Sequence, residues 1–277
     1  MKIDEVKMKL INYNIHLLLF LLVLLMHSNN IQSQILFPES FPVIFDTTKN
    51  YKGSITPEFN IQTQKELLVE INNTTEIAIK IKNNSLIIAN KFELEKFGSE
   101  TFLSGGYIYA KFKNFTDRRC MLEYYSQYQW AEARGLDTKY AFGTNFRLKV
   151  YKNLKGGFFT GIGPFYEFEK WIFDGVKDEN LPEDTTPIET KSIKINFYLS
   201  FKRILLEVLN LDIGLYFQSK IKTLFNNPRF ASGTELSYKI NDNVSIGIVY
   251  RNIYDYHPIV PIDNWYHRIY YQLSATF

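Results

Sequence analysis

The residues best suited to acid–base chemistry lie in one short stretch near the end of the chain. Asp255 and His257 are separated by a single residue, and Asp263 and His267 follow soon after. Because residues two apart on a strand share a face, Asp255 and His257 could form an acid–base pair. Histidines beside aspartates in loops are also common without any catalytic role. This stretch is therefore the one place where a hydrolase at the rim of a larger structure could be built.

No other pattern in the sequence supports that hydrolase. There is no glycine-rich phosphate loop, no nucleophile elbow and no fingerprint of a bound cofactor. The four residues near the end show no metal-ligand spacing beyond Asp-x-His. We therefore expect no enzyme activity, no catalytic residues, no cofactor and no metal, and we rank the rim hydrolase behind two non-enzymatic functions.

Most of the chain follows a strand period. In FASGTELSYKI, residues 230–240, Phe230, Leu236 and Tyr238 fall on one face, while Glu235 and Lys239 fall on the other. This alternation indicates strands with one apolar and one polar face. Strands of this kind are expected at 52–64, 66–80, 84–96, 101–113, 120–131, 138–152, 156–173, 188–203, 205–221, 228–240, 243–255 and 266–277.

The connections between these strands differ in length in a regular way. NLKG, a turn near Ile204 and ND are short, whereas DGVKDENLPEDTTPIE and YHPIVPIDN are long. Short turns at one end and long loops at the other are typical of outer-membrane barrels. A soluble sandwich or lipocalin-like barrel would use shorter strands and fewer aromatics than the 16% found here. We predict an all-β fold, a single transmembrane antiparallel up-and-down β-barrel of about twelve strands.

The N-terminus has the features of an export signal. Lys2, Lys7 and Lys9 precede an apolar run, and a polar stretch ends at Ser33. The run is too short to span a bilayer as a helix, which favours a cleaved signal peptide over an uncleaved anchor. We therefore expect export across the inner membrane and residence in the bacterial outer membrane. The expected division of the chain is a signal peptide at 1–33, a short periplasmic lead at 34–50 and the barrel at 51–277.

Composition excludes several other classes. The net charge is only +3 and the basic residues are scattered singly, so nucleic acid is not an expected partner. Cys120 is the only cysteine, which rules out an intrachain disulfide. Trp130, Trp171 and Trp265 fall near strand ends on the long-loop side, where aromatic rings sit at lipid headgroups.

The polar faces should point into the barrel and carry charges of both signs. Strand pairing places Lys111 near Glu123, Lys139 near Glu169, and Glu235 diagonally near Arg251. These pairs could brace a packed interior, or they could line a narrow channel that selects small solutes. Gly143, Gly161 and Gly163 also face inward and would leave space, permit bending or make room for Arg147. The expected lumen-lining charges are Lys111, Glu123, Lys139, Arg147, Glu167, Glu169, Lys194, Asp212, Glu235, Arg251 and Arg268.

Two further stretches, YQWAEARGLDTKYAFGTNF and GFFTGIGPFYEFEKW, carry distinctive motifs, and a resemblance to a known family covers most of the mature chain. The chain resembles the salt-stress-induced outer-membrane protein family, domain of unknown function 481. The resemblance implies a small outer-membrane barrel without an established activity, and the family name implies a salt response that the residues do not show. The motif residues are Glu132, Arg134, Gly135 and Leu136, then Gly163, Pro164, Tyr166 and Glu169, and finally Leu273 and Phe277.

The chain ends as a strand without a polar tail. Tyr271, Leu273 and Phe277 lie on one face of it and are similar to the C-terminal signal that barrel-assembly machinery reads. The expected partners are outer-membrane lipid, lipopolysaccharide and that machinery. A receptor or adaptor that holds a protein partner on its extracellular loops is the alternative function. Its apolar contact surface would be Pro258, Ile259, Val260 and Pro261.

Overall fold

The computed structural model describes residues 50–277 except 64–66, 98–99, 115–117, 133–134, 174–175, 177–179 and 225. The expected signal peptide, all but the last residue of the lead, and the motif residue Arg134 lie outside the described residues. Those expectations therefore stay predictions. No helix among the described residues is long and apolar enough to cross a membrane.

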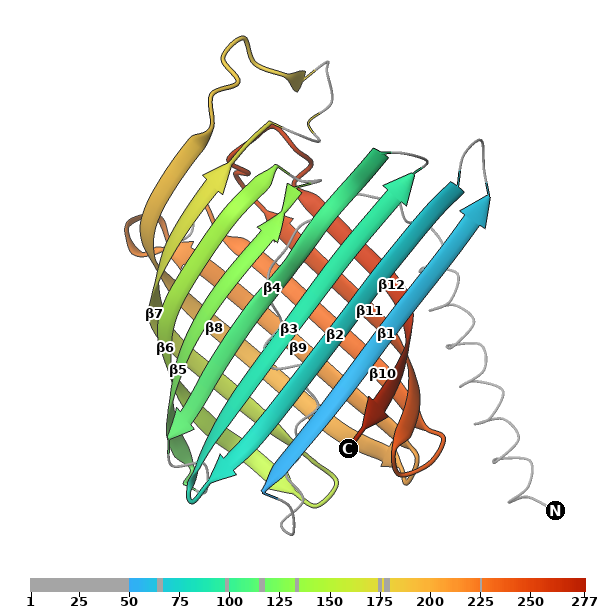
Figure 1. Cartoon of the computed structure of the whole chain (residues 1–277). Helices are drawn as coiled ribbons and strands as arrows, with labels where there is room; N and C mark the ends of the chain where they lie inside the picture. The colour runs from blue at the N-terminus through green and yellow to red at the C-terminus, as the bar shows by residue number, and fades with distance from the viewer. Residues whose placement is uncertain are drawn as a thin grey trace, which may run out of the picture.

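Twelve antiparallel strands form a closed barrel in which each strand pairs with its sequence neighbours and the last pairs with the first (Figure 1). This confirms the predicted fold class. A 3₁₀ turn, η4 (Ile221–Thr223), follows β9. The strands are β1 (Tyr51–Thr63), β2 (Leu67–Ile81), β3 (Asn84–Phe97), β4 (Glu100–Asn114), β5 (Cys120–Ala131), β6 (Leu136–Asn153), β7 (Gly156–Trp171), β8 (Ile188–Leu206), β9 (Leu209–Lys220), β10 (Arg229–Lys239), β11 (Val244–Asp255) and β12 (Trp265–Thr276).

The predicted strand ends are close to these bounds, with one clear error. The turn expected near Ile204 lies at 207–208 instead. Ile204 pairs with Asn210 and Leu206 pairs with Leu209, so the β8–β9 ladder continues past the expected turn. The apolar run from Ile204 to Leu206 contains no turn residue that could have marked the boundary.

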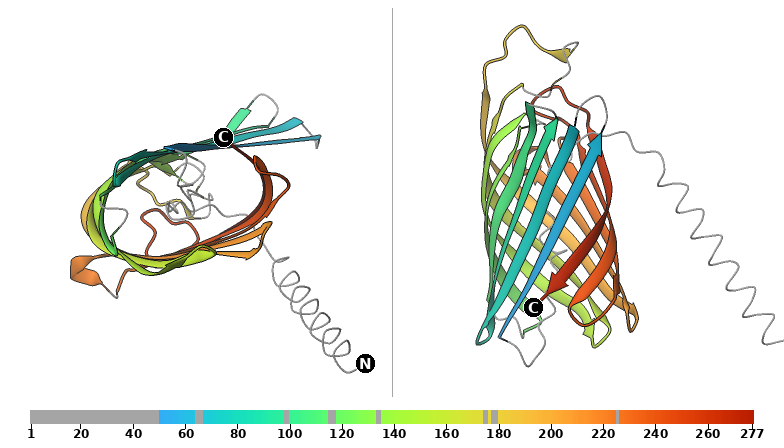
Figure 2. Two further views of the ribbon diagram at one scale, coloured as in Figure 1. Left: turned by 90° about the horizontal axis from the view of Figure 1, so that it is seen from below. Right: turned by 45° about the vertical axis from the view of Figure 1, so that its right-hand side comes forward.

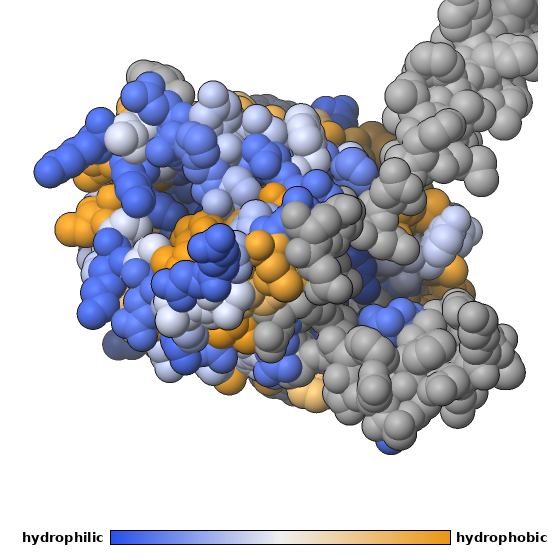
Figure 3. Space-filling model, turned by 90° about the horizontal axis from the view of Figure 1, so that it is seen from above, coloured by the Kyte–Doolittle hydropathy of each residue, from blue (hydrophilic) through white to orange (hydrophobic). Residues whose placement is uncertain are grey.

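The long connections after β7 and β11 lie at one end of the barrel, as expected from the sequence, but the short connections between β1 and β2 and between β3 and β4 lie at that end too (Figure 1). In the β10–β11 turn, the Asn241 side-chain oxygen accepts hydrogen bonds from the main-chain N–H groups of Asn243 at 2.9 Å and Val244 at 2.8 Å. Asparagine suits this role because its short side chain can replace a main-chain acceptor. From the long-loop end, the described surface is largely hydrophilic, with hydrophobic patches among the loops (Figure 3).

Alternation along each strand separates two environments. In β7, Phe165, Glu167 and Glu169 are buried, whereas Ile162 and Tyr166 between and before them are exposed. The barrel therefore has large apolar side chains outside and charged side chains inside, the reverse of a soluble protein with an apolar core.

The three tryptophans do not all face outward as predicted. Trp265 is 54% exposed, while Trp171 is buried among apolar residues at the long-loop end. Odd-numbered residues of β7 point inward, so Trp171 cannot reach a lipid headgroup. Its strand-end position alone did not reveal which face it occupies.

The last residue closes the barrel. Gly53 and Phe277 exchange two main-chain hydrogen bonds, both 3.0 Å long. A Cβ atom added at Gly53 would lie 2.4 Å from Cζ of Phe277, so the ring lies directly over the glycine. Only glycine leaves room for this contact.

Removing Phe277 should lower the yield of folded barrel. The deletion removes both closing hydrogen bonds, each worth about 0.5–1.5 kcal/mol, and the ring over Gly53. The folded fraction can be measured from the faster migration of unheated protein on a denaturing gel. Phe277→Tyr keeps the ring and main chain and serves as the control. Equal folded yields for the deletion and the control would contradict this role.

Candidate functional site

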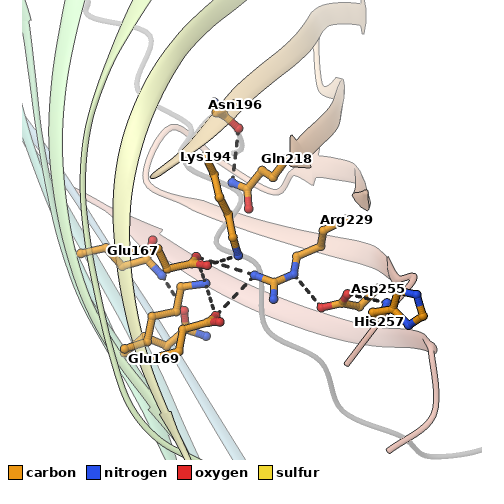
Figure 4. A network of polar contacts seen from close by, with 11 residues as sticks. Glu167, Glu169, Lys194, Asn196, Gln218, Arg229, Asp255 and His257 are labelled. Atoms are coloured by element: carbon orange, nitrogen blue, oxygen red, sulfur yellow. Dashed lines mark hydrogen bonds and ion pairs between the residues drawn. The ribbon is translucent and has the colours of Figure 1, made fainter. Parts of the chain in front are cut away.

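The most extensive polar network lies inside the barrel and joins β6, β7, β8 and β10 (Figure 4). Lys139 Nζ lies 2.6 Å from Glu167 Oε2 and 3.1 Å from Glu169 Oε1. Lys194 forms a further ion pair with Glu167. Arg229 Nη1 lies 3.4 Å from Glu169 and 3.7 Å from Glu167. Two carboxylates are thus shared among three cations, in a region where both glutamates are buried.

Arg229 also connects this network to the residues first considered for catalysis. Its Nε donates a hydrogen bond of 2.8 Å to Asp255 Oδ2, and the main-chain N–H of His257 donates one of 3.3 Å to Asp255 Oδ1. The Asp255 carboxylate is therefore held as the partner of an arginine (Figure 4). Among the described residues, no group of three or more histidine, cysteine, aspartate or glutamate side chains could hold a metal ion.

A second network centres on Glu123 of β5, which is 0% exposed. Arg147 of β6 lies 3.4 Å away, and Lys113 and Lys111 of β4 lie at 3.6 Å and 3.9 Å. The Tyr198 hydroxyl of β8 donates a 2.7 Å hydrogen bond to the other carboxylate oxygen. Because β6 and β7 lie between β5 and β8, this last bond reaches across the inside of the curved wall.

The remaining expected lumen charges also lie on inward positions. Asp212 Oδ2 is 2.5 Å from Lys202, Glu235 accepts a 2.8 Å hydrogen bond from Gln272, and Arg268 is 2.6 Å from Glu93. Arg251 lies opposite Gly233 in the β10–β11 register, one step diagonally from Glu235. The expected neighbours Lys111–Glu123 and Lys139–Glu169 are brought together as described above.

Several partners were missing from the sequence-based set. Tyr198, Arg229 and the Asn145–Asn196 pair make contacts between strands that are not neighbours, which strand alternation does not predict. Lys113 and Lys202 lie directly opposite Glu123 and Asp212, so cross-strand pairing could have found them. The missed residues are Lys91, Glu93, Lys113, Asn145, Asn196, Tyr198, Lys202 and Arg229.

Two of the inward glycines, Gly143 and Gly161, make room for tyrosine rings, and Gly161 also lies opposite Arg147 in the β6–β7 register. A Cβ atom on Gly161 would lie 2.2 Å from the Tyr198 ring, and one on Gly143 would lie 2.5 Å from Tyr125. At Gly163 a Cβ atom would lie 1.8 Å from the main-chain oxygen of Thr144, so glycine there permits a close approach of strands.

The interior is filled unevenly. At mid-height, a cavity of only about 30 Å³, room for roughly two water molecules, lies between Lys111, Glu167 and Tyr198. Near the short turns, a larger cavity of about 170 Å³ is lined by residues that include Glu76, Glu235 and Asn243. The described side chains therefore leave more room at the short-turn mouth than at mid-height on this side of the barrel.

The last long loop folds into the barrel mouth. Val260 is 0% exposed and packs with Trp171, Leu136, Ala131 and Val176. The view from below shows this red segment inside the ring of strands (Figure 2). Val260, in the middle of the predicted apolar contact surface on this loop, is buried within the protein. The prediction is wrong for this residue. Hydrophobic residues in a loop sequence do not show whether they face solvent or the barrel.

The loop motif explains part of this packing. Gly135 has a φ of 70°, in the left-handed region that favours glycine, and its N–H donates to the Glu132 carbonyl at 2.8 Å. The Gly135 carbonyl in turn accepts a 2.7 Å bond from the Ile172 N–H. This turn positions Leu136 against Trp171. The other motif residues, Pro164 and Tyr166, lie on the exposed face of β7.

The chain is similar to one protein family and to several solved structures. A family model described as "Protein of unknown function, DUF481" matches residues 88–259, more than half of the chain. No curated protein matches the sequence. Solved structures similar to this chain include the NanC porin, the KdgM porin and the translocator domain of autotransporter NalP from Neisseria meningitidis.

These structural similarities are distant. The NanC porin is 9% identical, covers 82% of this chain and 98% of its own, and has a TM-score of 0.45. The KdgM porin has the same identity and coverage with a TM-score of 0.41. The NalP domain is 9% identical, covers 83% of this chain and 89% of its own, and has a TM-score of 0.48.

Glu123→Gln should strongly destabilise the barrel. Loss of this charge leaves a buried arginine and two lysines without their shared carboxylate, which costs about 3–5 kcal/mol. Tyr198→Phe removes one hydrogen bond to the same carboxylate and should cost about 1–3 kcal/mol. Urea unfolding of refolded protein, followed by tryptophan fluorescence, measures both. A smaller loss for Glu123→Gln than for Tyr198→Phe would refute the central role of Glu123.

Gly161→Ala should also lower the free energy of unfolding, by about 1–3 kcal/mol, because the new methyl group overlaps the Tyr198 ring. Gly247→Ala is the matched control, since its Cβ atom would meet its nearest neighbour at an ordinary 3.4 Å. Combining Gly161→Ala with Tyr198→Leu should recover part of the loss. The same unfolding assay detects the difference, and equal effects of the two single alanines would count against the ring-over-glycine contact.

Proposed function

This chain belongs to the DUF481 family of proteins of unknown function, and we propose that it is an outer-membrane β-barrel that conducts small charged solutes through a narrow interior. The proposal joins three features: the apolar exterior, the charged interior and the bridge that Arg229 forms to Glu167 and Glu169. Residence in the bacterial outer membrane, export across the inner membrane and a leader at 1–33 are parts of the same proposal.

The exterior supports the membrane location. Large apolar side chains such as Phe142, Phe146, Ile193 and Leu215 are exposed on the outer face of β6, β8 and β9. Strands of 11 to 19 residues are long enough for a tilted crossing of a hydrocarbon layer of about 30 Å. In water such a surface would be an aggregation hazard, whereas in lipid it is favourable.

The bridge formed by Arg229 is the observation that carries the channel proposal. Arg229 lies on β10 and its partners Glu167 and Glu169 lie on β7, so the side chains span the inside of the wall past β8 and β9. Charges of both signs line the interior on either side of this bridge. A solute passing here would replace part of its hydration shell with contacts to these charged groups. The same exchange occurs at the charged rings of selective pores.

A purely structural role is the second candidate, and the Glu123 network favours it. Its Glu123, Lys111, Arg147 and Tyr198 side chains are buried and brace β4, β5, β6 and β8, with only a small cavity beside them. In this structural role the interior charges form ion pairs that connect the strands, and they do not line a route for solutes.

The two remaining alternatives have less support. The contact surface expected of a receptor is disrupted because Val260 is buried. A rim hydrolase lacks a free carboxylate at Asp255, which is bound by Arg229. Contacts with lipopolysaccharide and with assembly machinery stay expectations from the barrel architecture, and a link to salt stress rests on the family resemblance alone.

Single-channel recording in planar bilayers tests the proposal. The wild-type barrel should give small conductance steps, and Arg229→Ala should give larger and more cation-selective steps. The reason is that the substitution removes the bridge and leaves Glu167, Glu169 and Asp255 without its positive charge. Arg203→Ala is the matched control, since Arg203 is exposed near the end of β8. If neither the wild type nor Arg229→Ala gave steps above leak, transport would be abandoned in favour of the structural role.

A further inference from the structure

The barrel closes along an incomplete seam. β1 pairs with β2 along its whole length, from Tyr51 to Thr63. With β12 it pairs only at Ser54↔Thr276 and Ile55↔Ala275, next to the reciprocal bonds between Gly53 and Phe277. In the described part of the chain, no ladder joins the rest of β1 to β12. From below, β1 and β2 run past the red strands instead of following the curve of the wall (Figure 2).

Pro57 explains where the ladder stops. Main-chain groups alternate in direction along a strand, and the bonds of Gly53 show that odd-numbered residues of β1 face β12. Continuing the register places Pro57 opposite Leu273. Proline has no N–H, so one of the two hydrogen bonds expected between Pro57 and Leu273 cannot form. The seam therefore ends directly after its paired segment.

The consequence is an open edge on β12. By the same alternation, the N–H and C=O groups of His267, Ile269, Tyr271 and Leu273 face the seam, while the even-numbered residues face β11. No described strand pairs with these groups. Tyr271 is 72% exposed, the highest value among large apolar side chains in the described strands, as expected where a neighbouring strand is missing.

A side-chain ion pair joins β12 to β3 in the region where β12 and β1 are not paired. Arg268 of β12 lies 2.6 Å from Glu93 of β3, which also pairs with Lys91. The Arg268 guanidinium also lies over the Tyr270 ring, 5.0 Å from its centre. This contact passes behind β1 and β2 on the inside of the barrel. The junction between β1 and β12 thus has a short paired segment, an unpaired edge of β12 and an ion pair on the inside of the barrel.

We propose that this open edge of β12 binds an extended polypeptide segment, which adds to the sheet as a further strand. Unpaired N–H and C=O groups facing hydrocarbon are strongly unfavourable, and an added strand pairs with them in register. A lipid chain cannot, because it has no hydrogen-bonding groups. The proposal is independent of whether the barrel conducts solutes.

The edge also defines the chemistry of the segment. Four seam-facing residues, spaced two apart, fit an incoming strand of roughly seven to nine residues. Its outward side chains should be apolar, to match Ile269, Tyr271 and Leu273. Its inward side chains should be polar and include an acid, because Lys91 and Arg268 share the single Glu93 carboxylate. The segment is therefore an alternating strand with an acidic inward face.

A labelled peptide provides the probe. It copies residues 55–63 with Pro57→Val, which gives apolar residues at positions 55, 57, 59 and 61 and places Glu58 on the other face. A photo-crosslinking residue at Tyr271 should capture the peptide, and the same residue at Phe197, on the fully paired β8, should not. Methylation of the peptide amides at positions 59 and 61 should abolish capture, whereas methylation at 58 and 60 should leave it.

Disulfide bonds between β1 and β12 provide a second test. In a Cys120→Ser background, cysteines at Asn60 and Tyr270 would join the strands in the open part, and cysteines at Ser54 and Thr276 would join them in the paired part. The control disulfide should form readily and leave peptide binding unchanged. The test disulfide should form slowly and, once formed, abolish binding measured by fluorescence anisotropy.

The outcomes are distinct from those for conduction. Equal capture of the two methylated peptides would overturn strand addition, as would capture at Phe197 or no capture at all. Rapid formation of the disulfide between positions 60 and 270 would show that the seam is closed. A crosslinked dimer formed through Tyr271 without peptide would assign the edge to a second copy of the chain and overturn the proposal. Channel conductance recorded with the control-stapled protein reports on solute passage separately.

Discussion

Closure of the sheet is the constraint on which the rest of the structure depends. Once twelve strands pair in a ring, whether a residue is odd or even decides whether its side chain meets the interior or the surroundings. That rule places Glu167 and Glu169 inside and Tyr166 outside within a few residues. It also concentrates charge in a confined space, where each carboxylate needs a cation close by. The ion-pair networks are therefore a consequence of closing a sheet with this alternation.

How much could be predicted from the sequence follows from the range of each interaction. Strand bounds and the pairs Lys111–Glu123 and Lys139–Glu169 depend on neighbouring strands, so periodicity and turn position were enough. Contacts such as Tyr198–Glu123 or Arg229–Glu169 join strands that are two or three places apart, and they depend on the curvature of the wall. Loop residues have no such period, which is why the burial of Val260 and the inward side of Trp171 were not anticipated.

Tyrosine and glycine together set how the interior is filled. Tyr198 lies over Gly161 and places its hydroxyl on Glu123, so one ring fills space and also satisfies a buried charge. A barrel of this size needs large side chains to avoid an empty centre, and it needs small ones opposite them. The same arrangement explains why the middle is tight while the short-turn mouth keeps a larger cavity.

The inward fold of the last loop makes the two ends of the barrel unequal. Val260 and Trp171 belong to an apolar cluster at one mouth, whereas the cavity at the opposite mouth is lined by polar residues that include Glu76 and Glu235. The two mouths of the barrel therefore present different surfaces. If the barrel conducts solutes as we propose, ions that enter from opposite sides meet different surfaces first, polar side chains at one mouth and apolar side chains at the other. Its current should therefore depend on the direction of the applied voltage.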